Sequence, residues 1–312
     1  MMRALAMLAV LAMTPFAPPP IEHETVEVNG VRLHYARSGS GPLIVFLHGF
    51  PEFWYAWKSQ LDEFGRNHLA VAPDMRGYNL SSKPAAVEDY RMPLLVADVR
   101  ALATKLGASA NRKFVLVGHD WGGAVAWAYA MAHPDTLDRL VIVNAPHPAV
   151  FLRELRANPA QQKASQYMLM FRGPDAEATL SANGHEMLVR AVMGQGLKDG
   201  HFTEADKNAY IEAWSQPGAL TGGLNYYRAA QVGPPGSASA PPSESNLPTA
   251  KVTVPTLVIW GEKDTALLTG NLDGLDAHVP QLTIRRIPEG THWVVHEQPD
   301  LVNRHIREFI RR

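Results

Sequence analysis

Short apolar segments alternate with segments of helical period over most of the chain. Residues 43–47 form a continuous apolar run, which is typical of a strand buried on both faces of a parallel sheet. Runs of the same kind recur at residues 69–72, 114–117, 140–143, 256–260 and 282–287. Helical patterns occur at residues 53–64, 93–106, 121–133 and 300–310. Strands that alternate with helices predict an α/β fold with a doubly wound, mostly parallel sheet.

The alternation stops between residues 147 and 248. This part contains no apolar run that predicts a buried strand, and its helical patterns lie at residues 149–157, 162–171, 185–193 and 203–214. We therefore expect an all-helical cap over residues 147–248, inserted into a core formed by residues 21–146 and 249–312. Residues 232–243 are rich in Pro, Gly and Ser, which predicts a loosely packed linker where the chain leaves the cap.

The first 20 residues have the order of a signal peptide. Arg3 precedes an apolar run over residues 4–13, and proline is frequent in residues 14–20. The apolar run has about ten residues, which is too short to span a bilayer, so we expect no stable membrane insertion. A secreted or periplasmic protein is predicted, and a disordered leader on a cytoplasmic protein is the alternative.

Charge and composition exclude several kinds of partner and cofactor. The 312 residues include 29 basic and 30 acidic side chains, and no long basic run offers a binding surface for nucleic acid. The absence of cysteine excludes disulfides, thiol nucleophiles and cysteine metal sites. Most of the 13 histidines are scattered without the spacing of a zinc site. We therefore expect a small-molecule substrate, no metal and no cofactor.

Polar residues follow three of the predicted strands at the end where ligands bind in open α/β sheets. Asp120, Asp264 and His292 come after the third, fifth and sixth apolar runs. A nucleophile, an acid and a histidine thus occur in the chain order that hydrolases with such a sheet use. The sequence predicts that the three side chains meet at one edge of the sheet.

Asp120 lies in the segment Gly118-His-Asp-Trp-Gly-Gly123, between a predicted strand and a predicted helix. A lone aspartate at such a position is usually a helix N-cap. The three glycines favour a different interpretation, because a strained turn needs small residues where its backbone crosses neighbouring segments. We interpret Asp120 as a nucleophile, since a carboxylate that attacks carbon forms an ester, which histidine and water can hydrolyse.

Five segments carry a family resemblance: His48-Gly-Phe-Pro-Glu52, Asp74-Met-Arg-Gly-Tyr78, Gly118-His-Asp-Trp-Gly-Gly123, Trp260-Gly-Glu-Lys-Asp264 and Gly290-Thr-His292-Trp293. Together they resemble the soluble-type epoxide hydrolases of the α/β-hydrolase superfamily, over about residues 25–309. In that family the cap supplies two tyrosines, which Tyr167 and Tyr227 match. Tyr226 is the alternative to Tyr227, because neighbours on a helix point about 100° apart.

The resemblance implies an enzyme that converts an epoxide and water to a vicinal diol. Asp120 would open the ring and become an alkyl ester, while the two tyrosines act on the epoxide oxygen. His292, oriented by Asp264, would then activate the water that hydrolyses the ester.

The resemblance also implies supporting groups around these residues. Backbone N–H groups of Phe50 and Trp121 would hold the oxyanion of ester hydrolysis. Asn144 matches the place where part of the family carries the orienting acid, and it cannot carry a charge, so that role is assigned to Asp264. From the residues alone, Trp54 and Met170 are expected to line a substrate pocket, and the apolar segment at residues 168–171 favours an apolar epoxide.

Two other functions fit part of the pattern. A haloalkane dehalogenase uses the same aspartate ester, but its halide leaving group needs N–H donors and no proton, so two tyrosines favour epoxide chemistry. Phe50 also stands where many dehalogenases carry a halide-binding Asn. A non-catalytic binding protein is the third hypothesis, although a binding pocket does not require Asp120, Asp264 and His292 together.

Overall fold

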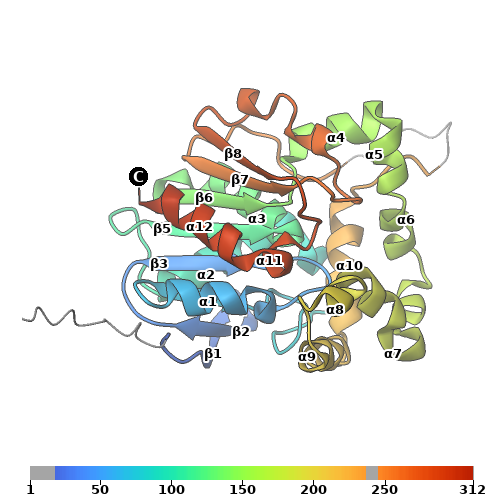
Figure 1. The fold of residues 1–312 in the computed structure, drawn as a ribbon, viewed down its shortest axis with the longest axis horizontal. Coiled ribbons are helices and arrows are strands. Elements are labelled where there is room, and N and C mark those ends of the chain that lie inside the picture. The colour runs from blue at the N-terminus through green and yellow to red at the C-terminus, as the bar shows by residue number, and fades with distance from the viewer. Residues whose placement is uncertain (1–17, 237–244, 312) are drawn as a thin grey trace, which may run out of the picture.

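One mostly parallel sheet of eight strands organises the described part of the chain (Figure 1). The computed structural model describes residues 18–236 and 245–311. The strand order is β1-β2-β4-β3-β5-β6-β7-β8. Pairs β1–β2 and β2–β4 are antiparallel, and the other pairs are parallel. The strands are β1 (Glu22–Val28), β2 (Val31–Ser38), β3 (Leu43–Leu47), β4 (Leu69–Pro73), β5 (Phe114–His119), β6 (Leu137–Val143), β7 (Thr256–Gly261) and β8 (Leu282–Ile287). The predicted doubly wound, mostly parallel sheet is confirmed.

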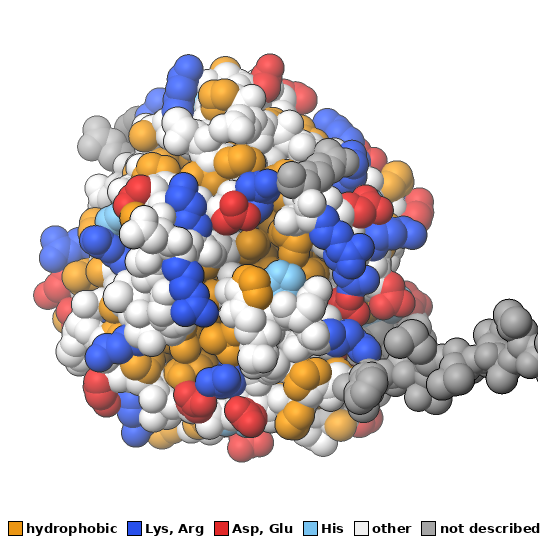
Figure 2. Space-filling view, turned by 90° about the vertical axis from the view of Figure 1, so that its left-hand side faces the viewer, with side chains coloured by type: hydrophobic (Ala, Val, Ile, Leu, Met, Phe, Trp, Pro, Cys, Tyr) orange, Lys and Arg blue, Asp and Glu red, His pale blue; other side chains and the backbone are white. Residues whose placement is uncertain are grey.

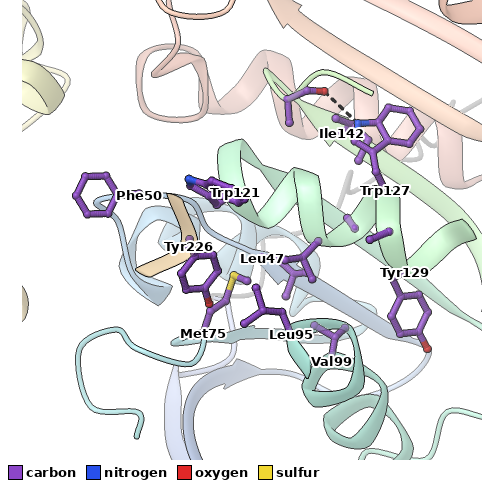
Figure 3. Packing of buried hydrophobic residues seen from close by; sticks show 14 of the residues in the cluster. Leu47, Phe50, Met75, Leu95, Val99, Trp121, Trp127, Tyr129, Ile142 and Tyr226 are labelled. Carbon is purple, nitrogen blue, oxygen red and sulfur yellow. Dashed lines mark hydrogen bonds between the residues drawn. The ribbon is translucent and has the colours of Figure 1, made fainter. Parts of the chain in front are cut away.

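Helices cover both faces of the sheet, which explains why the strands are apolar at successive positions. In β3, Ile44 and Phe46 pack in the cluster under α1 (Lys58–Phe64), α11 (Val294–Glu297) and α12 (Pro299–Ile310). Val45 and Leu47 pack in the opposite cluster, under α2 (Met92–Lys105) and α3 (Asp120–Ala132) (Figure 3). Since each such side chain contributes about 1.5–3 kcal/mol on full burial, both layers fix the position of the strand ends.

The segment between β6 and β7 folds as helices, and its described residues contain no strand. We call this segment, from α4 to α10, the helical insertion. Its helices are α4 (Pro148–Ala157), α5 (Pro159–Ala164), α6 (Tyr167–Arg172), α7 (Ala176–Met193), α8 (Gly196–Asp199), α9 (Glu204–Trp214) and α10 (Ala219–Ala230). The single helix predicted over residues 162–171 is wrong, because the chain breaks at Ser165 into α5 and α6.

Helix α10 is the part of the helical insertion that the apolar pattern does not predict. Its sequence contains Gly222 and Gly223, which lower helix propensity. Both positions lie against the core. A Cβ atom at Gly222 would be 2.3 Å from the carbonyl oxygen of Gly77, and one at Gly223 would be 2.7 Å from the Phe50 ring. The glycines therefore allow α10 to approach the loops that follow β3 and β4.

Two predicted segments fall largely outside the described residues. The predicted leader covers residues 1–20, of which 1–17 are not described, and the Pro-rich linker includes the undescribed residues 237–243. Within the described ranges, none of the helices combines the length and apolar character needed to cross a membrane. Basic and acidic side chains are interspersed on the face shown in Figure 2, in keeping with the net charge of -1.

Candidate active site

Asp120 stands at a sharp turn between β5 and α3. Its φ angle is +50°, in the left-handed region that side chains rarely adopt. The glycines around it have no room for side chains: a Cβ atom at Gly122 would be 2.2 Å from the carbonyl oxygen of Leu47, and one at Gly118 would be 2.4 Å from the carbonyl oxygen of Gly122. This crowding explains the Gly-rich sequence and holds the Asp120 side chain at the edge of the sheet.

The two oxygens of the Asp120 carboxylate have different surroundings. Oδ1 accepts a hydrogen bond of 2.8 Å from the backbone N–H of Phe50. Oδ2 lies 3.7 Å from Nε2 of His292, which is too long for a direct hydrogen bond. Trp121 follows in the first turn of α3, where backbone N–H groups have no partner within the helix. Oδ1 is thus held by one backbone donor, while Oδ2 is the oxygen that lies toward His292.

His292 forms a close pair with Asp264, from the loop that follows β7. Nδ1 of His292 lies 2.7 Å from Oδ2 of Asp264, and the His292 side chain is 12% exposed. Burial by itself lowers the pKa of His292, but the charge of Asp264 and its hydrogen bond, together with the charges of Asp120 and Glu52, raise that pKa to about 9. Burial also acts to raise the pKa of Asp264, yet the charge and hydrogen bond of His292 bring it below the usual value.

Asp264 is itself held on both oxygens. Oδ1 accepts backbone N–H bonds from Ala266 at 2.8 Å and Leu267 at 2.9 Å. Oδ2 accepts a bond of 2.8 Å from the side-chain amide of Asn144 as well as the His292 bond. The sequence interpretation used Asn144 only to rule out a second acid. The structure places it as a donor to Asp264, which leaves the carboxylate no freedom to rotate.

Tyr167 and Tyr227 face each other from α6 and α10, with ring centroids 6.3 Å apart. Burial, and next the charge of Asp120, raise the pKa of both phenols well above the usual value. The phenol of Tyr226 is directed elsewhere: it donates a hydrogen bond of 2.8 Å to the backbone carbonyl of Arg76 and lies beside Met75 (Figure 3). The geometry therefore selects Tyr227 over Tyr226 as the second phenol near Asp120.

One apolar cavity joins Asp120 to the two phenols. The space between its atoms is about 450 Å³, and this volume includes open solvent at the mouth. Asp120, Tyr167 and Tyr227 line it, and the other lining residues are nonpolar: Trp121, Ala124, Pro146, Pro148, Phe151, Met168, Val232, Leu247 and Leu267. We call this space the apolar cavity.

The two residues predicted to line the substrate pocket are not among those that line the apolar cavity. Trp54 lies in a 3-10 turn over Trp54–Trp57, where its ring packs edge-on against His23 of β1 with centroids 4.8 Å apart. Met170 packs against the main hydrophobic cluster, whereas Met168 of the same helix lines the cavity. A substrate contact of Trp54 or Met170 therefore stays a prediction, because residue type does not specify which side chains of a helix line a cavity.

A buried acid–histidine network behind the site has no counterpart in the sequence prediction. Glu52 accepts hydrogen bonds from Nδ1 of His119 at 3.0 Å and from the hydroxyl of Tyr210 at 3.0 Å, and it lies 2.5 Å from Nε2 of His296. Nε2 of His119 is 2.9 Å from the backbone carbonyl of His292. The charges of both histidines lower the pKa of Glu52 against its burial. Glu52 and His119 stand in the quoted motifs, so the signal was present, but spacing alone does not pair them.

Comparison with known proteins places the chain in a family. The family described as alpha/beta hydrolase fold matches residues 42–299. An α/β-hydrolase superfamily protein of Bacillus subtilis is 40% identical over 93% of this chain and 98% of its own length. Epoxide hydrolase 4 of Mus musculus is 38% identical over 92% of this chain and 78% of its own length. The crystal structure of a Bacillus megaterium epoxide hydrolase with an inhibitor has a TM-score of 0.86 at 37% identity, over 93% of this chain and 100% of that chain. The chain therefore belongs to the α/β-hydrolase fold family and, within it, to the epoxide hydrolases.

Proposed function

We propose that this protein hydrolyses epoxides to vicinal diols through an alkyl ester on Asp120. The observation that carries the proposal is the pairing, across one apolar cavity, of the Asp120 carboxylate with the two buried phenols of Tyr167 and Tyr227. A carboxylate supplies the nucleophile for a ring carbon, and phenols supply the hydrogen bonds and the proton that the departing epoxide oxygen needs.

Ring opening uses the free oxygen of Asp120. Because Oδ1 is held by the Phe50 N–H, Oδ2 attacks a ring carbon, and the bond from that carbon to the epoxide oxygen breaks. Tyr167 and Tyr227 hydrogen-bond to this oxygen, and one of them gives it a proton. The raised pKa values of both phenols keep them protonated at neutral pH, as a general acid must be.

Hydrolysis of the ester uses His292. Water attacks the carboxyl carbon of Asp120 and gives one proton to Nε2 of His292, while the developing oxyanion is held by the N–H groups of Phe50 and Trp121. The ester bond to the substrate breaks, and His292 returns the proton to the departing alkoxide. The second proton of the water restores the phenol, and Asp120 is again a carboxylate.

Loss of charge at Asp120 prepares His292 for this step. The Asp120 carboxylate is one of the groups that raise the pKa of His292 to about 9 in the free protein. The ester carries no charge, so its formation lowers the pKa of His292 and favours the neutral imidazole. His292 therefore becomes available as a base once the ester on Asp120 has formed.

The walls of the apolar cavity favour an apolar substituent on the epoxide. A variant of the Bacillus megaterium relative has been crystallised with its product, (R)-3-[1]naphthyloxy-propane-1,2-diol. For this chain we propose alkyl and aryl epoxides, and styrene oxide is a suitable first substrate.

The test is a single turnover of styrene oxide in ¹⁸O-labelled water with enzyme in excess. The label is expected in Asp120 after this turnover, and in the diol only after the labelled enzyme is given more styrene oxide. Label in the first diol would reject the ester. Asp120→Ala should form no diol, whereas Tyr226→Phe, in which the altered phenol lies outside the cavity, should retain activity. Halide release from a bromoalkane in place of diol formation would support a dehalogenase.

A further inference from the structure

A second cavity reaches the proposed catalytic histidine from a different set of elements. It lies between the end of α7 with α8 and the loops that follow β7 and β8, and it holds about 1300 Å³ counted out to solvent. Its lining includes Arg190, Lys263, Thr291 and Gln298, all with polar side chains. We call it the polar cavity.

His292 lies close to both cavities, because its Nε2 is 3.7 Å from Oδ2 of Asp120. It lines the polar cavity and is not among the residues that line the apolar cavity, while Asp120 lines only the apolar one. The imidazole is fixed between them because Nδ1 bonds to Asp264 and its ring stacks edge-on against Trp293, with centroids 4.8 Å apart. Trp293 also lines the polar cavity, and its indole N–H donates to the backbone carbonyl of Ala191 at 2.9 Å, so it ties the end of α7 to the loop of His292.

The ester step needs a water that the apolar cavity is poorly suited to deliver. A buried water is stable where it has about two to four polar partners, and the apolar cavity offers only the groups that the bound substrate occupies. After ring opening, the alkyl group is covalently attached to Asp120 and fills this same cavity. The polar cavity is open to solvent, and its lining includes His292, the residue proposed to activate the water.

We propose that the hydrolytic water enters through the polar cavity and reaches His292 without passing through the apolar cavity. This inference rests on the proposed function, because it assigns an entry route to the second substrate of that reaction. The epoxide and the water then approach Asp120 from separate cavities, which allows ring opening in an apolar space and ester hydrolysis from a hydrated one.

The test narrows the polar cavity without touching the catalytic groups. Ala191 and Thr265 are exposed residues on two walls of the polar cavity, so Ala191→Trp and Thr265→Trp place bulk in it at little cost in packing. Ala178→Trp is the control, because Ala178 is an exposed alanine in the first part of α7, before the non-helical backbone at residues 182–185, and is not among the lining residues of either cavity. Ester formation and decay are followed by rapid quench and intact-protein mass spectrometry with styrene oxide.

Both plugging variants are expected to form the ester at the rate of the control and to hydrolyse it about 10-fold more slowly, so that the ester accumulates. Ester hydrolysis at the control rate in both variants would overturn the entry route and leave the proposed function intact. Equal slowing of ester formation and hydrolysis would also overturn it, because it would indicate distortion of the site. A wild-type protein that forms no ester would overturn the proposed function and the entry route together.

Discussion

Replacement of Asp264 by Asn should stop the reaction at the ester. Oδ1 of Asp264 is fixed by two backbone N–H donors, so the amide oxygen of the variant takes that place and its NH₂ group faces Nδ1 of His292. Two donors cannot bond to each other. His292 then presents an unprotonated Nδ1 and carries its proton on Nε2, the nitrogen that must accept a proton from water.

The magnitude follows from what the pair contributes. The rise in the pKa of His292 from 6.5 to about 9 corresponds to about 3 kcal/mol in favour of the charged imidazole, and Asp264 is the main group that raises it. General-base catalysis contributes about 10²- to 10⁴-fold in rate, or about 3–5 kcal/mol. We therefore expect the rate of ester hydrolysis in the Asp264→Asn variant to fall by about 10²- to 10⁴-fold. The rate of ester formation should stay the same, because that step depends on Asp120 and the phenols.

The assay is intact-protein mass spectrometry after rapid mixing with styrene oxide, in which the variant should accumulate one covalently bound epoxide per chain. A rescue variant makes the test specific. The double variant Asn144→Asp with Asp264→Asn places a carboxylate at position 144 instead of 264. In the wild-type protein the side-chain nitrogen of Asn144 lies 2.8 Å from Oδ2 of Asp264, so the new carboxylate should recover part of the rate of ester hydrolysis. Equal loss of both steps in Asp264→Asn, or steady-state turnover at the wild-type rate, would refute the assignment.

Three further predictions separate the proposed roles. Tyr227→Phe should slow ester formation by at least about 10-fold in single turnovers, whereas Tyr226→Phe should leave this rate unchanged and lower the unfolding free energy by about 1 kcal/mol, because it removes a buried bond to a backbone carbonyl. The pKa of His292 is higher in the folded state than the ordinary 6.5, so protonation of His292 stabilises the folded protein fully below pH 6.5. This stabilisation, up to about 3 kcal/mol, should be lost as the pH rises through about 9. Denaturant titrations at several pH values should show the loss, and the His292→Gln variant should not show it. Gly222→Ala should slow ester formation, because the new Cβ atom would overlap the Gly77 carbonyl and displace α10. Gly236→Ala is the control, because a Cβ atom there meets nothing within 4 Å. Equal rates of ester formation in the two variants would show that close packing of α10 on the core is not required.

The sheet was predictable because burial on two faces leaves a strong local pattern. A strand covered by helices on both sides has no polar alternation, so the run at residues 43–47, in which every residue is buried, matches β3 in full. The helical insertion leaves a weaker pattern. The break between α5 and α6 and the existence of α10 depend on contacts with distant loops, such as Gly222 against Gly77, and these contacts have no signature in a window of neighbouring residues.

The same distinction applies to the candidate site. Asp120, Asp264 and His292 follow buried strands whose ends meet at one edge of the sheet, so their convergence follows from strand order and is what the structure shows. Asn144 and Glu52 also follow strands, but their partners are chosen by side-chain direction and loop conformation. Sequence spacing gives neither side-chain direction nor loop conformation, and for the same reason it does not determine which side of the fold Trp54 faces.

In the proposed mechanism, the choice between an epoxide and a halide substrate depends on Tyr227, which is far from Asp120 in the sequence. The turn at Asp120 is determined by glycines within three residues of it and serves any reaction that proceeds through an aspartate ester. The phenol of Tyr227 reaches the apolar cavity only because α10 packs its glycines on the core, and rotation by one residue would direct it to the Arg76 carbonyl that Tyr226 occupies. Under the proposed function, reaction specificity therefore depends on how closely α10 approaches the core. A relative with the same turn, acid and histidine would then change its leaving group if that contact alone changed.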